Sequence, residues 1–166
     1  MMSMVTVSSL ERISASRLAE MLLAQASRAT TTGTGTDTAA AIADSEDPTR
    51  VAIVDVRDDD YIGGHIRSSM HFASQSLDAT MPTLLRKLAD KETVVFHCAL
   101  SQQRGPAAAL RYLREREAAS GKGNAGGEKK KQTVYVLDRG FVGWQEVYGN
   151  DERLTEGYRK ELWEDY

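Results

Sequence analysis

Short apolar runs alternate along the chain with longer segments in which apolar residues recur every three or four positions. Residues 51–56 (VAIVDV), 93–97 (TVVFH) and 133–137 (TVYVL) are almost continuously apolar and rich in β-branched side chains. This pattern is typical of strands that are buried on both faces of a parallel sheet. The sequence therefore predicts a buried strand at each of these positions.

The segments between these runs have the apolar spacing of helices. Ser14 can cap a helix that continues to about Ala26, because its hydroxyl can accept a hydrogen bond from a free amide of the first turn. Pro106 stands near the first turn of another helix, where a missing amide is tolerated. Alternating strands and helices predict an α/β fold with a mostly parallel sheet. The apolar positions that define the helices are Leu18, Met21 and Leu22, then Met81, Leu84, Leu85 and Leu88, then Leu110 and Leu113, and finally Trp144, Val147 and Tyr148.

Two segments contain almost no large apolar side chains. Residues 27–49 are rich in Thr, Gly, Ala and Asp, and residues 118–132 are rich in Gly and Lys. Neither can bury enough apolar surface to offset the entropy of becoming ordered. We therefore expect residues 1–166 to form a single domain with these segments as flexible loops within it. In an alternative interpretation, the lysines at 129–131 form a docking patch for a partner protein.

Length, charge and cysteine content narrow the class of protein. A chain of 166 residues is the size of one ordinary domain, and its net charge of -3 gives no basic surplus for nucleic-acid binding. No apolar run approaches the roughly 20 residues that span a bilayer, and the first residues lack the pattern of a secretory signal. The single cysteine excludes an internal disulfide. We expect a protein of the cytoplasm or nucleus, with no membrane partner and no signal for an oligomeric state.

Cys98 directly follows one buried run and shortly precedes the helix that starts near Gly105. The amides of the residues between them can point inward, and donors at a helix N-terminus bind phosphate-like groups and favour the thiolate form of a cysteine. Arg104 can hold two oxygens of a tetrahedral oxyanion with its planar guanidinium. The alternative is a buried structural cysteine near a surface arginine. The three histidines and the cysteine lack metal-ligand spacing, so no metal site is expected.

Residues 97–106 (HCALSQQRGP) resemble the active-site motif of the M-phase inducer dual-specificity phosphatases and of the eukaryotic arsenate reductases. Both families have the rhodanese fold. Residues 51–66 (VAIVDVRDDDYIGGHI) and 137–149 (LDRGFVGWQEVYG) are similar to the "D-V-R … G-H-I" segment and to the closing strand and helix of that fold. The resemblance implies a rhodanese-like fold, with a central, mostly parallel sheet and helices on both faces.

The resemblance also implies an activity and a site. Cys98 would be the nucleophile of a protein tyrosine or dual-specificity phosphatase that forms a cysteinyl-phosphate, with a phosphoprotein or small oxyanion as substrate and no cofactor. Arg104 and the loop would bind the oxyanion. The substrate-binding loop residues are Ala99, Leu100, Ser101, Gln102 and Gln103.

The sequence departs from the cell-cycle phosphatases at Gln103, where they carry a glutamate proposed as an acid. An amide cannot donate a proton in that way. Replacement acids can come from carboxylates at strand ends, namely Asp58, Asp59, Asp60 and Asp138, which can also be turn caps or solvated residues.

Further residues near the motifs could take part in the reaction or could hold the structure together. Asp55 matches the rhodanese aspartate and is expected to stabilise the fold by hydrogen bonds. His65 could shuttle protons, or it could tie a loop to the sheet. His97 could promote the thiolate, or it could brace the loop. Trp144 and Phe141 are expected in the core.

Three other functions remain open for the same loop. An arsenate reductase would use Cys98 to attack arsenate, and its single cysteine would then require glutathione and glutaredoxin as external reductants. A sulfurtransferase would carry a persulfide on Cys98, although the loops of true rhodaneses are a residue shorter. An inactive rhodanese module would only bind partners.

Overall fold

The computed structural model describes residues 6–33, 51–121 and 132–164. Its main sheet has five strands in the order β1-β6-β5-β2-β4, and every strand pair in it is parallel. The three apolar runs form its centre, as the sequence predicts. The strands of this sheet are β1 (Glu11–Ile13), β6 (Thr133–Leu137), β5 (Thr93–His97), β2 (Val51–Asp55) and β4 (Met70–His71).

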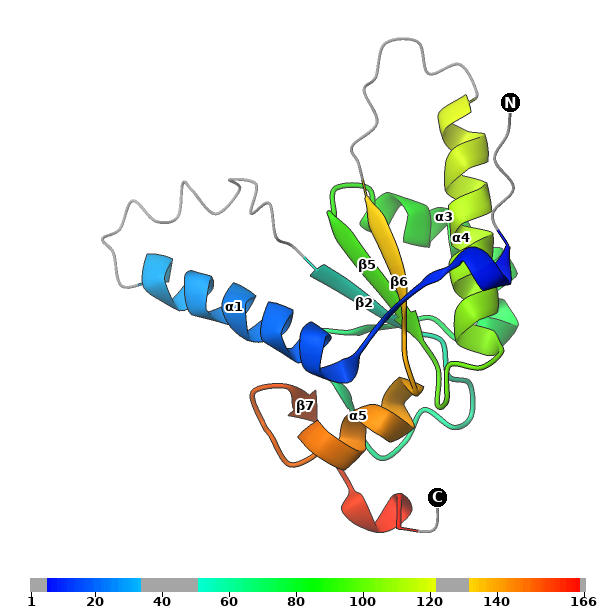
Figure 1. Ribbon diagram of the computed structural model, residues 1–166. Coiled ribbons are helices and arrows are strands. Elements are labelled where there is room, and N and C mark those ends of the chain that lie inside the picture. Colours follow the sequence, from blue (N-terminus) through cyan, green and yellow to red (C-terminus); the bar gives the residue numbers. More distant parts are fainter. Residues whose placement is uncertain (1–5, 34–50, 122–131, 165–166) are drawn as a thin grey trace.

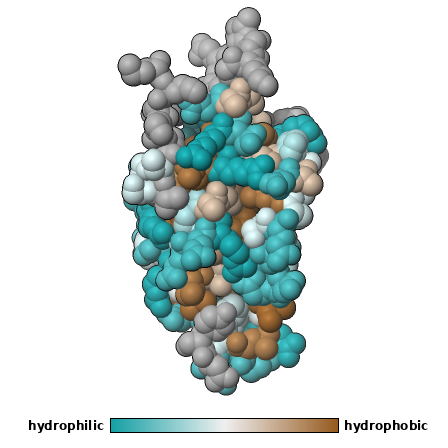
Figure 2. All heavy atoms as spheres, turned by 90° about the vertical axis from the view of Figure 1, so that its right-hand side faces the viewer, coloured by the Kyte–Doolittle hydropathy of each residue, from teal (hydrophilic) through white to brown (hydrophobic). Residues whose placement is uncertain are grey.

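Helices cover both faces of this sheet (Figure 1). On one face lie α1 (Ala15–Gly33) and α5 (Gly140–Tyr148), and on the other lie α3 (Leu77–Lys87) and α4 (Arg104–Gly121). Each helix buries its apolar side against the strands, which leaves charged residues of α4 at the surface. Figure 2 shows the resulting, mainly hydrophilic exterior on the right-hand side of Figure 1. The expected arrangement, a central, mostly parallel sheet with helices on both faces, is confirmed.

The core between the sheet and α4 is built around aromatic side chains. Phe96 of β5 and Tyr112 of α4 are fully buried, and their ring centroids lie 5.4 Å apart. Removing one such ring typically costs about 3–5 kcal/mol. The Tyr112 hydroxyl donates to Gln132, and Gln132 in turn donates to two backbone carbonyls after α3. This packing fixes the position of α4, and therefore of the loop that precedes it.

Two helices are longer than the sequence predicts. Ser14 caps α1 as expected, since its hydroxyl accepts the amide of Arg17 at 3.1 Å, but the helix continues past Ala26 to Gly33. The α4 helix continues to Gly121. The expected loops at 27–49 and 118–132 are therefore wrong at their helical ends, because a nucleated helix adds residues at little cost. Residues 34–49 and 122–131 of these segments lie outside the described residues.

The sequence did not predict the small elements. A second, two-stranded antiparallel sheet pairs β3 (His65–Ile66) with β7 (Thr155–Glu156). Short 3-10 turns lie at Val7–Ser9, Ser74–Ser76 and Lys160–Leu162. Within the described ranges, no helix combines the length and the apolar character that crossing a membrane requires.

Candidate active site

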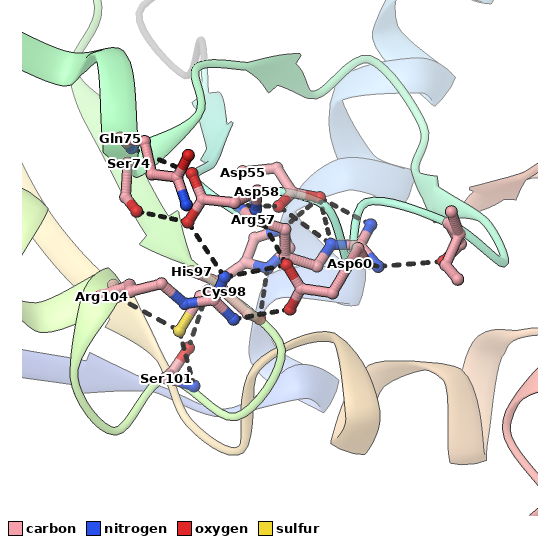
Figure 3. A network of polar contacts seen from close by, with 12 residues as sticks. Asp55, Arg57, Asp58, Asp60, Ser74, Gln75, His97, Cys98, Ser101 and Arg104 are labelled. Carbon is pink, nitrogen blue, oxygen red and sulfur yellow. Dashed lines mark hydrogen bonds and ion pairs between the residues drawn. The ribbon is translucent and has the colours of Figure 1, made fainter.

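Cys98 lies at the carboxyl end of β5, where the chain turns into α4. Its side chain is buried, and Sγ accepts backbone N–H groups from Ser101 at 3.2 Å and from Gly105 at 3.3 Å (Figure 3). Both donors belong to the first turns that lead into α4, where free amides carry partial positive charge. Two amide donors on one sulfur stabilise negative charge there. We call residues 98–104 the oxyanion loop.

Ser101 gives the oxyanion loop its shape. It adopts φ +56°, a left-handed conformation that residues other than glycine rarely use. The strain is offset locally, since its amide donates to Cys98 Sγ and its hydroxyl accepts the Cys98 amide at 3.4 Å. The side chain is fully buried. Ser101 therefore positions the loop rather than acting at the surface of the site.

The start of α5 holds the back of the loop. The amides of Phe141 and Val142 donate to the carbonyls of Cys98 and Ala99 at 3.0 and 2.9 Å. Gly140 makes this approach possible, because a Cβ there would lie only 2.5 Å from both carbonyl oxygens. With these carbonyls held away from the pocket, the loop presents amides to its interior.

The remaining loop residues offer backbone donors. Among the described residues, no acceptor takes the amides of Leu100, Gln102, Gln103 and Arg104. The side chains of Leu100, Gln102 and Gln103 are exposed, and that of Ala99 is buried. The predicted substrate-binding residues 99–103 thus lie together around Cys98. That their backbone amides bind an oxyanion stays a prediction.

Arg104 contacts carboxylates in this structure. Its Nη1 lies 2.8 Å from Oδ1 of Asp60 and 3.2 Å from Oδ2 of Asp58, and its Nη2 lies 2.6 Å from Oδ2 of Asp60 (Figure 3). The hydrogen bonds that Arg104 donates to Asp60 lower the pKa of Asp60 to about 2, and the same hydrogen bonds raise the pKa of Arg104. The sequence placed Arg104 on the oxyanion, whereas here its planar fork binds a carboxylate of matching geometry.

Asp58 has further partners. Burial raises its pKa, but hydrogen bonds from Ser74 Oγ, from the Gln75 amide and from Arg104 outweigh this and lower it. The carboxylate is therefore ionised at neutral pH. As they stand, neither Asp58 nor Asp60 holds a proton to give to a leaving group. Of the other candidate acids, Asp59 is exposed, and Asp138 lies 3.4 Å from Arg12.

A buried ion pair supports the segment that carries these carboxylates. Arg57 is fully buried and binds both carboxylate oxygens of Asp55, at 3.1 Å through Nε and at 2.8 Å through Nη2. It also donates to the carbonyls of Asp60, Ile62 and Gly64. Asp55 has the structural role expected from the sequence. The role of Arg57 was missed, although its place in the D-V-R motif was a signal.

His97 stabilises the oxyanion loop through a hydrogen bond to its backbone. Its Nδ1 donates to the Cys98 carbonyl at 3.0 Å, and the side chain is fully buried. Burial lowers its pKa, so the ring is neutral at neutral pH. Burial raises the pKa of Asp55, but the positive charges beside it and the hydrogen bonds from Arg57 outweigh burial and lower it overall. Asp55 is thus a carboxylate, and Nε2 of His97 lies 3.7 Å from it with no hydrogen-bond partner within the described segments.

Three other residues singled out in the sequence have structural roles. His65 Nε2 lies 3.0 Å from Glu156 Oε1 and links β3 to β7. This contact fits the structural role considered for His65 and not a proton shuttle. Phe141 and Trp144 are fully buried core residues. In the described part of the chain, no group of three or more His, Cys, Asp or Glu side chains is arranged to hold a metal ion.

Comparisons with known proteins match this geometry. A family model, the rhodanese-like domain, matches residues 37–147. A CDC25-like phosphatase of Saccharomyces cerevisiae is 42% identical over an alignment of 121 residues that covers 67% of this chain and 76% of the yeast protein. Arsenate reductase 2.1 of Oryza sativa subsp. japonica is 47% identical over an alignment of 100 residues that covers 58% of this chain and 57% of the rice protein. A solved yeast protein tyrosine phosphatase of the rhodanese family superposes with a TM-score of 0.66 and 32% identity, covering 96% of this chain and 99% of that one.

Proposed function

The chain belongs to the rhodanese-like domain family, and from that premise we propose that it is a cysteine-dependent phosphatase of the protein tyrosine and dual-specificity type. The observation that carries the proposal is the pair of backbone amides on Cys98 Sγ, at 3.2 and 3.3 Å, beside the N-terminus of α4. The phosphatase names of the yeast relative and of the yeast structure support it. Its substrates are oxyanion esters, with a phosphoprotein as the specific candidate.

The proposed reaction has two steps on one sulfur. The Cys98 thiolate attacks phosphorus, so that an S–P bond forms while the bond from phosphorus to the leaving oxygen breaks. Water then attacks the cysteinyl-phosphate, which releases phosphate and restores the thiolate. Amides of the oxyanion loop stabilise the negative charge that grows on the equatorial oxygens in each step. The residues supply all of this chemistry, so no cofactor is required.

Arg104 contributes after an exchange of partners. Its guanidinium binds both carboxylate oxygens of Asp60, and two oxygens of an entering phosphate can take their place in the same two-point arrangement. The phosphate dianion competes with Asp60 for Arg104. It is the stronger competitor, because the loop amides attract the dianion but do not contact the carboxylate of Asp60. The arginine then stabilises the charge of the transition state together with the loop amides.

Leaving groups decide the substrate class in this proposal. Gln103 cannot donate a proton, and Asp58 and Asp60 are held ionised. A phenol has a pKa of about 10, so its oxygen leaves as an anion more readily than an alkyl alkoxide does. Aryl phosphates, including phosphotyrosine, should therefore react faster than alkyl phosphates.

Arsenate reduction is the second candidate. The similarity to the rice arsenate reductase favours it, and arsenate fits a loop that accepts phosphate. Cys98 would form an S–As bond with loss of water, and two external thiols would supply the two electrons that reduce arsenic while they themselves become a disulfide. Since the chain has one cysteine, glutathione and glutaredoxin would be the thiol donors.

The location in cytoplasm or nucleus stays a prediction.

Side-by-side kinetics on an aryl phosphate, arsenate and thiosulfate test these alternatives. Wild type is compared with Cys98→Ser, which preserves size and removes the thiolate, and circular dichroism verifies that both are folded. We expect aryl phosphate turnover in wild type and only background in Cys98→Ser. Turnover that survives in Cys98→Ser contradicts the proposal. Arsenate- and glutathione-dependent NADPH oxidation without phosphatase activity would favour the second candidate, and persulfide chemistry on thiosulfate would favour a sulfurtransferase.

A further inference from the structure

Arg12 approaches the oxyanion loop from the edge of the sheet. It lies in β1, where it is in register with Val136 of β6. Its Nη2 donates to the Ser101 carbonyl at 3.2 Å, across 89 positions of sequence. Its Nη1 lies 3.4 Å from Asp138 Oδ1, which orients the guanidinium. A residue of the N-terminal segment is thereby bound to the loop that surrounds Cys98.

The Ser101 carbonyl is a sensitive point of that loop. Ser101 has φ +56°, and its amide and hydroxyl both point toward Cys98. Within residues 6–33, 51–121 and 132–164, Arg12 is the donor to this carbonyl. In a trans peptide the C=O and the following N–H point in opposite directions. Binding the carbonyl outward therefore aims the Gln102 amide toward the inside of the loop.

We propose that Arg12 is a positioning residue for the oxyanion site, which it serves by holding the Ser101 carbonyl outward and the Gln102 amide inward. This proposal rests on the proposed function, because it assigns the Gln102 amide to the oxygens of the substrate. Arg12 itself need not touch the substrate. Its guanidinium also adds positive charge beside a loop that binds anions.

A purely structural role for Arg12 predicts different behaviour. The side chain of Arg12 is 44% exposed and that of Asp138 is 57% exposed, so their ion pair contributes little to stability. Variants at Arg12 should therefore fold normally. If Arg12 only attached β1 to the rest of the sheet, its loss would lower the melting temperature and leave oxyanion affinity unchanged.

The test compares Arg12→Ala and Arg12→Lys with Arg153→Ala. Arg153 is a matched control, since it is an exposed arginine paired with a neighbouring carboxylate, Asp151, outside the site. Tungstate, a tetrahedral oxyanion, is titrated calorimetrically into each protein, and kcat/KM is measured on an aryl phosphate. Losing a positioned oxyanion donor typically costs about 10²–10³ in rate. We expect Arg12→Ala to lose about tenfold or more in both tungstate affinity and kcat/KM.

Arg12→Lys should recover part of each loss, because an ammonium can donate one hydrogen bond to the carbonyl. Arg153→Ala should match wild type, and all melting temperatures should agree closely. Equal tungstate affinity in wild type and Arg12→Ala overturns the proposal. If wild type lacks phosphatase activity but binds tungstate, the proposed function fails while the comparison of affinities still decides the role of Arg12.

Discussion

Arg104 and Asp60 form a two-point ion pair, with 2.8 Å between Nη1 and Oδ1 and 2.6 Å between Nη2 and Oδ2. The arginine that the proposed mechanism requires is therefore already bound to a carboxylate of the same protein. Arg57 fixes the segment that carries Asp60 through the carbonyls of residues 60, 62 and 64. The pair is a competitor that every oxyanion substrate must displace, and its strength sets part of the substrate affinity.

Asp60→Asn should strengthen oxyanion binding. The amide keeps the shape of the carboxylate and an oxygen for the Asp58 amide, but it removes the negative charge that holds Arg104. Because the ion pair is partly exposed, the gain in affinity should be modest, and KM for an aryl phosphate should fall about three- to tenfold. Steady-state kinetics at neutral pH measure it.

Asp59→Asn is the matched control, because it removes an equal charge from an exposed neighbour that makes no ion pair with Arg104. It should change KM less than Asp60→Asn does. Equal effects of the two substitutions would show that overall charge, and not the contact with Arg104, controls binding. A KM that rises in Asp60→Asn would show instead that Asp60 assists the arginine.

Gly140→Ala should damage the oxyanion loop. Gly140 has φ +56°, and a Cβ would lie 2.5 Å from the carbonyl oxygens of Cys98 and Ala99, so either the loop or the start of α5 must move. Backbone shifts near reacting groups are costly, and we expect kcat/KM to fall about 10²-fold or more. Activity and the free energy of unfolding are both measured.

Gly157→Ala provides the control for backbone strain alone. Gly157 has a similar φ of +67°, yet the nearest atom to its Cβ, the Cα of Gly64, is 3.9 Å away. It should lose about 1 kcal/mol of stability and keep its activity. If both variants retain wild-type kcat/KM, the close packing of α5 on the loop is not needed for the reaction.

His97 should make the protein less stable as the pH falls below about 6.5. Burial lowers its pKa in the folded state, so the unfolded chain takes up a proton in this range that the folded chain does not. Stability then declines by up to about 1.4 kcal/mol per pH unit, until the pKa of the folded state is reached. Asp60, with a folded pKa of about 2, adds a separate loss only below its unfolded value of 3.8.

This effect is measured by urea unfolding of wild type and His97→Asn between pH 7.5 and pH 5, in steps of about half a pH unit. Asparagine can donate to the Cys98 carbonyl but does not titrate, so the stability of the variant should vary less with pH over this range. Parallel curves for the two proteins would show that His97 is not responsible. The comparison of slopes remains valid even if the variant is less stable throughout.

The sequence predicted the elements that depend on local patterns. The strands at residues 51–55, 93–97 and 133–137 follow from continuous β-branched runs, and the cap at Ser14 follows from its position before an apolar spacing. The family and fold followed from the motif at 97–106. Strand and motif signals are local, so they survive without knowledge of the tertiary structure.

The contacts that organise the site were not predicted, because they join distant positions. Arg12 reaches Ser101 across 89 positions, and Arg104 reaches Asp60 across 44. Neither contact leaves a pattern in one sequence. The carboxylates were noted as candidate acids, and only the structure shows that two of them, Asp58 and Asp60, form ion pairs with Arg104.

The most direct test of the central claim is to trap the phosphorylated intermediate. Wild-type protein is mixed with excess aryl phosphate, quenched in acid within the first turnover, digested and examined by mass spectrometry. The account predicts one added phosphoryl group on the peptide that contains Cys98, and no such group on that peptide from Cys98→Ser. Turnover with a phosphoryl group on another residue, or turnover that persists in Cys98→Ser, would contradict it.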